Sequence, residues 1–104
     1  MGIYAITGAA SGIGRATAQQ LALAGHEIIT LDIRNADIEC DLSNAQQVAA
    51  AIAAVIERAP GGLDGFVPCA GVGPDFRNKA LISAINYFAV VDMVNGLLPS
   101  IKKN

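Results

Sequence analysis

The stretch that decides the fold is Thr7-Gly8-Ala9-Ala10-Ser11-Gly12-Ile13-Gly14. It follows a short apolar run at 3–6 and leads into a helical pattern at 12–24, so it predicts a strand, a tight turn and a helix in succession. Glycine has no Cβ and accepts positive φ, which lets a ligand approach the backbone closely. The amides at the start of a helix attract anions. In this context the turn favours a dinucleotide pyrophosphate site over a glycine-rich loop without a ligand.

Outward from the turn, short apolar runs alternate with helical patterns along the chain. The expected strands lie at 3–6, 27–31, 37–40 and 63–70, and the expected helices at 12–24, 43–58 and 79–98. Strands that are apolar on both faces indicate a parallel sheet covered by helices on each side. With right-handed crossovers, the sequence predicts an α/β fold with a doubly wound parallel sheet of strand order 3-2-1-4.

Several local features of this fold are predicted at single residues. Ser43 is expected to cap the second helix, and Pro99 to end the last one. One face of the first helix is marked by Ile13, Ala16, Thr17, Leu21 and Ala24. The residues of the second helix expected to face inward are Val48, Ile52, Val55 and Ile56. Pro68 lies inside the fourth strand, where its missing N–H would break a ladder hydrogen bond. The parallel assignment therefore requires an edge or a distortion at that strand.

Composition narrows the class of protein. The chain has 104 residues, of which 53% are hydrophobic, and this predicts one domain, 1–104, with a modest core. The net charge of −2 provides no basic surface, so neither nucleic acid nor an anionic membrane is expected as a partner. Cys40 and Cys69 both lie in apolar runs, which indicates a reduced, cytoplasmic protein.

Asp32 ends the second strand, 18 residues after Gly14. At this spacing a carboxylate meets the adenosine ribose of a bound dinucleotide. An ionised Asp32 would accept bonds from both ribose hydroxyls of NAD and would repel the 2′-phosphate of NADP. The alternative is an ordinary polar residue at a strand end. Arg34 could take a phosphate, but it is expected to be exposed or to cover the adenine. The sequence therefore predicts NAD as the cofactor.

The turn has the spacing Gly-x-x-x-Gly-x-Gly with threonine in front, and this resembles the short-chain dehydrogenase/reductase family. The resemblance extends over the whole chain. It implies a Rossmann-like sheet that is incomplete relative to the family, and hydride transfer between NAD and an alcohol or ketone. The implied cofactor-binding residues are Thr7, Gly8, Ser11, Gly12, Ile13, Gly14, Asp32, Ile33, Asp41, Leu42, Cys69, Ala70 and Gly71.

Within the family, the chain is most similar to the subgroup that acts on 3α-hydroxysteroids and other carbonyl compounds. The segments that carry this similarity are Ala24-Gly25-His26, Leu31-Asp32-Ile33-Arg34, Leu63-Asp64-Gly65, Cys69-Ala70-Gly71-Val72-Gly73-Pro74 and Asn86-Tyr87-Phe88.

Three positions have family roles only through this resemblance. Asp41 matches the aspartate that bonds the adenine amino group, although an acid flanking a helix cap would give the same pattern. Cys69 stands where the family usually has asparagine, so a side-chain bond that stabilises the centre of the sheet is not expected. Asn86 matches the asparagine that holds a water in the proton relay. The alternative for Asn86 is an ordinary buried helix asparagine.

The chemistry implied by the resemblance needs a serine and a Tyr-x-x-x-Lys motif, in which the lysine lowers the pKa of the tyrosine. Four residues after Tyr4 is Gly8, and four after Tyr87 is Val91, so neither tyrosine fits. His26 lies in a turn remote from the strand carboxyl ends and is expected to be an ordinary surface residue. We therefore expect this chain alone to be inactive. Two interpretations stay open: part of a dehydrogenase, or a complete, small, non-catalytic nucleotide-binding or interaction module.

The last expected helix is apolar around its whole circumference. Asn86, Asp92 and Asn95 would make a membrane span costly, so a buried helix is expected. One side would cover the sheet. The resemblance implies that the other side packs against the same helix of a second subunit, giving a homodimer or tetramer that acts on a small-molecule substrate. The apolar residues are Leu81, Ile82, Ile85, Phe88, Val90, Val91, Met93, Val94, Leu97 and Leu98.

Overall fold

The centre of the molecule is a parallel sheet. The computed structural model describes residues 1–71 and 84–102. Four strands form one sheet in the order β3-β2-β1-β4, and all neighbouring strands are parallel. This confirms the predicted strand order and the predicted parallel sheet. The strands are β1 (Ile3–Thr7), β2 (Glu27–Asp32), β3 (Ile38–Glu39) and β4 (Gly65–Pro68).

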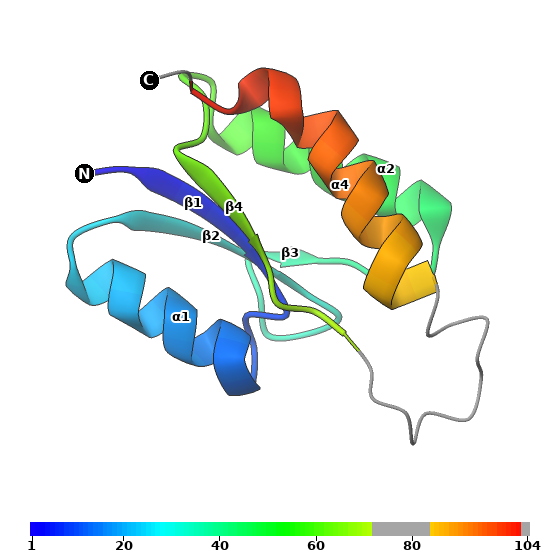
Figure 1. The fold of residues 1–104 in the computed structure, drawn as a ribbon, viewed down its shortest axis with the longest axis horizontal. Helices are drawn as coiled ribbons and strands as arrows, with labels where there is room; N and C mark the ends of the chain where they lie inside the picture. Colours follow the sequence, from blue (N-terminus) through cyan, green and yellow to red (C-terminus); the bar gives the residue numbers. More distant parts are fainter. Residues whose placement is uncertain (72–83, 103–104) are drawn as a thin grey trace.

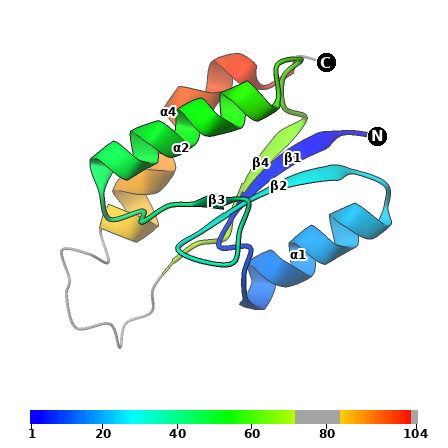
Figure 2. The ribbon, with the colours of Figure 1, turned by 180° about the vertical axis from the view of Figure 1, so that it is seen from behind.

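Helices cover both faces of the sheet (Figures 1 and 2). On one face lies α1 (Gly12–Leu23), and on the other α2 (Ala45–Arg58) and α4 (Ala89–Leu97) lie side by side. The π-helical turn η1 (Ala84–Phe88) leads into α4, and the 3₁₀ turn η2 (Leu98–Ser100) follows it. The strand order reverses at β1, since β2 lies on one side of it and β4 on the other. In such sheets, ligands bind at the strand carboxyl ends beside the reversal.

The hydrophobic core lies between the sheet and the pair of helices α2 and α4. Val48 and Val55 on α2 and Met93 on α4 are buried there. The two helices approach closely at Gly96, where a Cβ atom would lie 2.8 Å from Cδ1 of Ile52. Since real Cβ contacts are longer than this, a larger residue at 96 would require the Ile52 side chain to shift.

Two helix ends differ from the sequence-based expectation. Asn44, not Ser43, caps α2, because its side-chain oxygen accepts a bond from the Gln47 amide at 3.0 Å. Of the helix predicted at 79–98, residues 79–83 lie outside the described residues. The remainder is divided into η1, α4 and η2; α4 ends at Leu97, and Pro99 lies in the 3₁₀ turn η2 that follows it. Proline is tolerated there because the first turn of a helix needs no backbone donor.

The inward face predicted for α2 is confirmed at Val48 and Val55, which are buried, and is wrong at Ile56. The face predicted for α1 is mostly exposed. Ile13 is 80% exposed and Ile56 is 40% exposed. The fully buried residue of α1 is Gly14, at the start of the helix. Helix α1 therefore makes its closest approach to the sheet through backbone at its first turn, which leaves the side chain of Ile13 at the surface.

Pro68 ends β4 without breaking its ladder with β1. The Cys69 amide donates to the Thr7 carbonyl oxygen at 3.2 Å. Because successive amides of a strand face opposite sides, the nitrogen of Pro68 faces away from β1. Within the described residues β4 is an edge strand, as Pro68 requires. Just before β4, Leu63 forms an isolated parallel bridge with Ile101.

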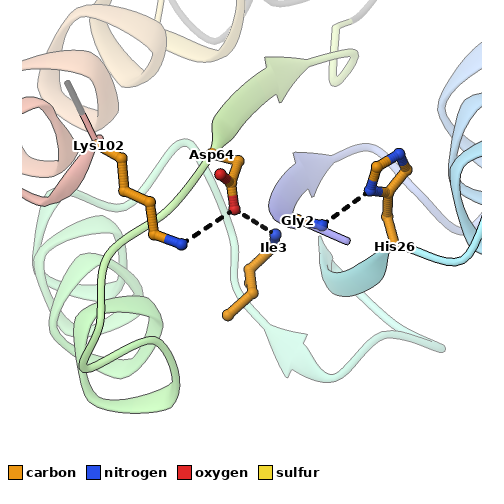
Figure 3. A network of polar contacts seen from close by, with 5 residues as sticks. All are labelled: Gly2, Ile3, His26, Asp64 and Lys102. Carbon is orange, nitrogen blue, oxygen red and sulfur yellow. Dashed lines mark hydrogen bonds and ion pairs between the residues drawn. The ribbon is translucent and has the colours of Figure 1, made fainter. Parts of the chain in front are cut away.

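A network of side chains holds the amino end of β1 (Figure 3). The Gly2 amide donates to Nδ1 of His26 at 2.9 Å, and the Ile3 amide donates to Oδ2 of Asp64 at 2.7 Å. The Ile3 bond is the main reason that the pKa of Asp64 lies below its usual value. Lys102 Nζ lies 3.5 Å from the same carboxylate oxygen. The expectation that His26 is an ordinary surface residue is therefore wrong: it anchors a strand, at the end of the sheet opposite the strand carboxyl ends.

The outer side of α4 and its flanking turns carries exposed apolar side chains. Tyr87, Val91, Val94 and Leu98 recur at helical spacing, and we call them the outer α4 face. Their exposed fractions are 61%, 37%, 39% and 60%. The opposite side, which includes Met93, packs on the core. No helix in the described part of the chain combines the length and apolar character that a membrane crossing needs.

Candidate nucleotide-binding site

The turn after β1 contains glycines that cannot be replaced without strain. Gly8 has a φ of 68°, and a Cβ atom there would lie 2.6 Å from the backbone nitrogen of Ala70. A Cβ atom on Gly14 would overlap the carbonyl oxygen of Gly8. Gly12 has a φ of 58° but open space around it, so conformation alone requires glycine there. The predicted turn is therefore packed tightly between the end of β4 and the start of α1.

The first turn of α1 supplies backbone amides without intrahelical acceptors. Ser11, the N-cap residue, is extended and makes no side-chain cap bond. Arg15 donates to the Ser11 carbonyl oxygen at 3.2 Å, so the amides of Gly12, Ile13 and Gly14 precede the first intrahelical donor. The first turn contains no acidic residue. These amides and the positive end of the helix dipole would stabilise a negatively charged group.

Asp32 lies at the carboxyl end of β2, next to this turn. Its Oδ2 atom accepts a bond from the Ala10 amide at 3.0 Å, and its Oδ1 atom accepts one from the Ile33 amide at 2.7 Å. A carboxylate oxygen accepts more than one hydrogen bond, so both atoms retain capacity for the hydroxyls of a ligand. The carboxylate is therefore held in a defined orientation and is still able to bind.

Asp41 and Cys40 follow β3 on the other side of β2. The Ser43 hydroxyl and the Ser43 amide donate to Oδ1 of Asp41 at 2.6 and 2.9 Å, and these bonds hold the pKa of Asp41 below its usual value. Burial, and to a smaller extent the Asp41 charge, raises the pKa of the Cys40 thiol. At neutral pH this segment therefore presents a fixed carboxylate beside a neutral thiol.

The end of β4 closes the site on the remaining side. Cys69, Ala70 and Gly71 follow the strand, and the Ala70 amide donates to Oγ1 of Thr7 at 3.3 Å. Thr7 is buried, and this hydrogen bond joins the end of β1 to the end of β4. Asn86 lies beside Gly71, since a Cβ atom on Gly71 would be 3.1 Å from Oδ1 of Asn86.

These segments surround a cavity of about 560 Å³ at the carboxyl ends of the strands, a size that suits a small-molecule ligand. Every predicted cofactor-binding residue except Thr7 lines it. The lining residues are Gly8, Ser11, Gly12, Ile13, Gly14, Asp32, Ile33, Cys40, Asp41, Leu42, Ser43, Cys69, Ala70, Gly71 and Ile85.

Three lining residues are absent from the sequence-based set. Cys40 and Ser43 flank the predicted pair at 41–42. Their position at the carboxyl end of a strand could have identified them as cavity residues. Ile85 reaches the cavity from η1, and no sequence pattern distinguishes it from the other apolar residues of that segment. Arg34, the candidate phosphate ligand, is exposed and does not line the cavity. Within 1–71 and 84–102, no cluster of three or more His, Cys, Asp or Glu residues could hold a metal ion.

Comparison with known proteins identifies the family. The family described as short chain dehydrogenase matches residues 3–104. The chain belongs to the short-chain dehydrogenase family. It is 42% identical over 103 residues to the 3-alpha-hydroxysteroid dehydrogenase/carbonyl reductase of Comamonas testosteroni, covering 99% of this chain and 40% of that protein. The predicted resemblance to the hydroxysteroid and carbonyl subgroup is thereby confirmed.

Solved structures of the family agree with this assignment. The 3-alpha-hydroxysteroid dehydrogenase from Pseudomonas sp. B-0831, crystallised with NADH, has a TM-score of 0.89 and 50% identity, over 91% of this chain and 37% of that one. The 3-ketoacyl-(acyl-carrier-protein) reductase from Brucella melitensis, also with NADH, has a TM-score of 0.80 and 26% identity, over 95% of this chain and 49% of that one. The chain spans about 40% of the length of the curated relative it matches.

Proposed function

We propose that this chain is the NAD(H)-binding portion of a short-chain dehydrogenase/reductase. The reaction would transfer a hydride between NAD and an alcohol or ketone, with a 3α-hydroxysteroid or another carbonyl compound as substrate. The observation that carries the proposal is the single cavity in which the glycine turn, the first amides of α1 and Asp32 meet. The relatives from Comamonas and Pseudomonas supply the substrate class.

The residues of the cavity fit the adenosine half of NAD. The amides of Gly12 and Gly14 would receive the pyrophosphate, because neither residue carries a side chain that would hold the phosphates away from the backbone. Asp32 would accept bonds from the ribose hydroxyls and exclude a 2′-phosphate. Asp41 would accept a bond from the adenine amino group. Leu42, with the neighbouring apolar side chains, would enclose the base.

NAD, when bound, accepts or supplies the hydride. The chain's own residues bind and orient the adenosine end of the cofactor. In this proposal Asn86, beside Gly71 at the cavity, supports the family's proton relay by holding a water. No Tyr-x-x-x-Lys occurs within the 104 residues, so none of them is assigned as the proton donor.

Titration of NAD and NADP into the chain and into Asp32→Ala tests this proposal. We expect wild type to bind NAD more tightly than NADP, and Asp32→Ala to lose about tenfold or more in NAD affinity, the magnitude of one hydrogen bond to a charged group. Asp37→Ala is the matched control, since that carboxylate accepts the Thr30 amide at 3.0 Å and does not line the cavity. Preference of the wild type for NADP, or unchanged NAD affinity in Asp32→Ala, would contradict the proposal.

We also propose self-association as a homodimer or tetramer through the outer α4 face, in the reduced environment of the cytoplasm. The support is physical. Four apolar side chains at helical spacing are exposed together on one side of a helix whose other side is already packed. Burial of such side chains contributes about 1.5–3 kcal/mol each.

A further inference from the structure

The carboxyl end of β2 is bonded to the glycine turn through three successive amides. Gly8 and Ala9 donate to the carbonyl oxygen of Leu31, at 2.8 and 3.5 Å. Ala10 donates to Oδ2 of the Asp32 side chain at 3.0 Å. The first two bonds use backbone oxygen, which any residue supplies. The third depends on the identity of residue 32.

We infer that Asp32 is a positioning residue for the phosphate-binding turn, in addition to the ribose-binding role proposed above. The Ile33 amide donates to Oδ1 at 2.7 Å and fixes the carboxylate, so that Oδ2 is presented to Ala10. Hydrogen bonds to an ionised acceptor are roughly twice as strong as neutral ones. The next residue after Ala10 is Ser11, the cap of α1, so the position of Ala10 sets the position of the helix amides.

This double role gives the Asp32 charge two opposing effects on an anion held by the turn. Through space, a carboxylate repels phosphate, so its removal would strengthen phosphate binding. Through the Ala10 bond, the same carboxylate holds the turn in its binding conformation, so its removal would weaken phosphate binding. The inference is that the second effect is larger, and that discrimination between NAD and NADP cannot be changed at this position without loosening the turn.

Amide exchange at Ala10, followed by NMR in the ligand-free chain, tests the bond directly. We expect the Ala10 amide to exchange about tenfold faster in Asp32→Ala. Part of the protection should return in Asp32→Asn, whose single amide oxygen can accept from Ala10 only by giving up the bond from Ile33. Asp37→Ala is the control and should leave Ala10 unchanged. Equal Ala10 exchange in wild type and Asp32→Ala would overturn the inference.

Titration with inorganic pyrophosphate, which has no ribose, separates positioning from ribose binding. This readout rests on the proposed function, because it assumes that the turn binds the cofactor's phosphates. We expect Asp32→Ala to bind pyrophosphate about tenfold more weakly than wild type, with partial recovery in Asp32→Asn. Tighter binding by Asp32→Ala would show that repulsion dominates and would overturn the inference. Binding of pyrophosphate but not of NAD by wild type would refute the proposed function and leave the inference intact.

Discussion

Gly8 and Ala70 are in direct backbone contact across the end of the sheet. A Cβ atom on Gly8 would lie 2.6 Å from the Ala70 nitrogen, and 2.7 Å from its Cα. The two residues belong to the glycine turn and to the end of β4, which are more than sixty positions apart in sequence. This contact closes the site between β1 and β4, so the stability of the fold and the shape of the cavity depend on the same glycine.

Alanine at Gly8 should destabilise the chain more than alanine at Gly12. Both residues have positive φ, 68° and 58°, but only Gly8 is crowded. Gly12→Ala should lower the free energy of unfolding by about 1–2 kcal/mol, the cost of the left-handed conformation. Gly8→Ala should lose a further 1–3 kcal/mol, approximately, from overpacking. Urea denaturation measures both. Equal losses of unfolding free energy in the two variants would mean that the backbone at Ala70 moves away from residue 8 without an energetic cost.

The 104-residue chain should show no dehydrogenase turnover with steroid, ketone or alcohol substrates. The tyrosines at 4 and 87 lack a lysine four residues later, so neither fits the motif that supplies the proton in this chemistry. NADH formation followed by absorbance measures this. NADH production that survives repurification and disappears in Gly14→Ala would show that another residue of the chain serves as the catalytic group.

The outer α4 face should make the isolated chain associate at micromolar concentration. Val94→Lys with Leu98→Lys should shift sedimentation toward monomer and weaken association at least about tenfold, because burying an unpaired ammonium group costs several kcal/mol. Leu23→Lys is the control: Leu23 is 85% exposed, but it lies on α1, across the sheet. A monomeric wild type with a cooperative melt would instead favour a self-sufficient binding module.

The bonds from Ser43 to Asp41 should contribute stability that is lost in acid. The folded pKa of Asp41 lies below its unfolded value of about 3.9, so the contribution is complete above that pH and disappears as pH falls through the folded pKa. The stability difference between wild type and Asp41→Asn should therefore shrink from pH 7 to pH 3. It should be below about 1 kcal/mol, because the group is partly exposed to solvent. Urea melts at the two pH values decide this, and a difference that grows in acid would be inconsistent with the bonds.

The sheet could be predicted from sequence because its determinants are local. Four apolar runs, the glycine turn and the right-handed crossover rule give the strand order without knowledge of any tertiary contact. The place of Asp32 followed from its position at a strand end. Ile13 could not be placed, since its burial depends on how closely Gly14 lets the helix approach the sheet. The choice of Asn44 over Ser43 as the cap depended on a local bond that the sequence pattern does not show, because the Ser43 hydroxyl donates to Asp41.

The role of His26 and the bond from Ala10 to Asp32 were also beyond sequence reasoning. Each joins residues more than twenty positions apart. Such pairs are set by strand register, and a shift of one residue would move every side chain to the other face. In the register of the structure, Tyr4 lies opposite Ile28 on β2 and Gly65 on β4.

Pro68 limits the ways in which copies of this chain can associate. A free strand edge is a template for intermolecular β-pairing and fibril growth, and within residues 1–71 and 84–102 β4 is the edge next to the site. Its last residue offers no N–H outward, and Ile101 occupies the place beside Leu63 at the other end. A second chain that docked on this edge would find too few consecutive donors to extend the sheet. Any assembly of the chain should therefore consist of folded molecules that contact one another through helices. Such an assembly should dissociate on dilution, whereas stacked cross-β strands would not.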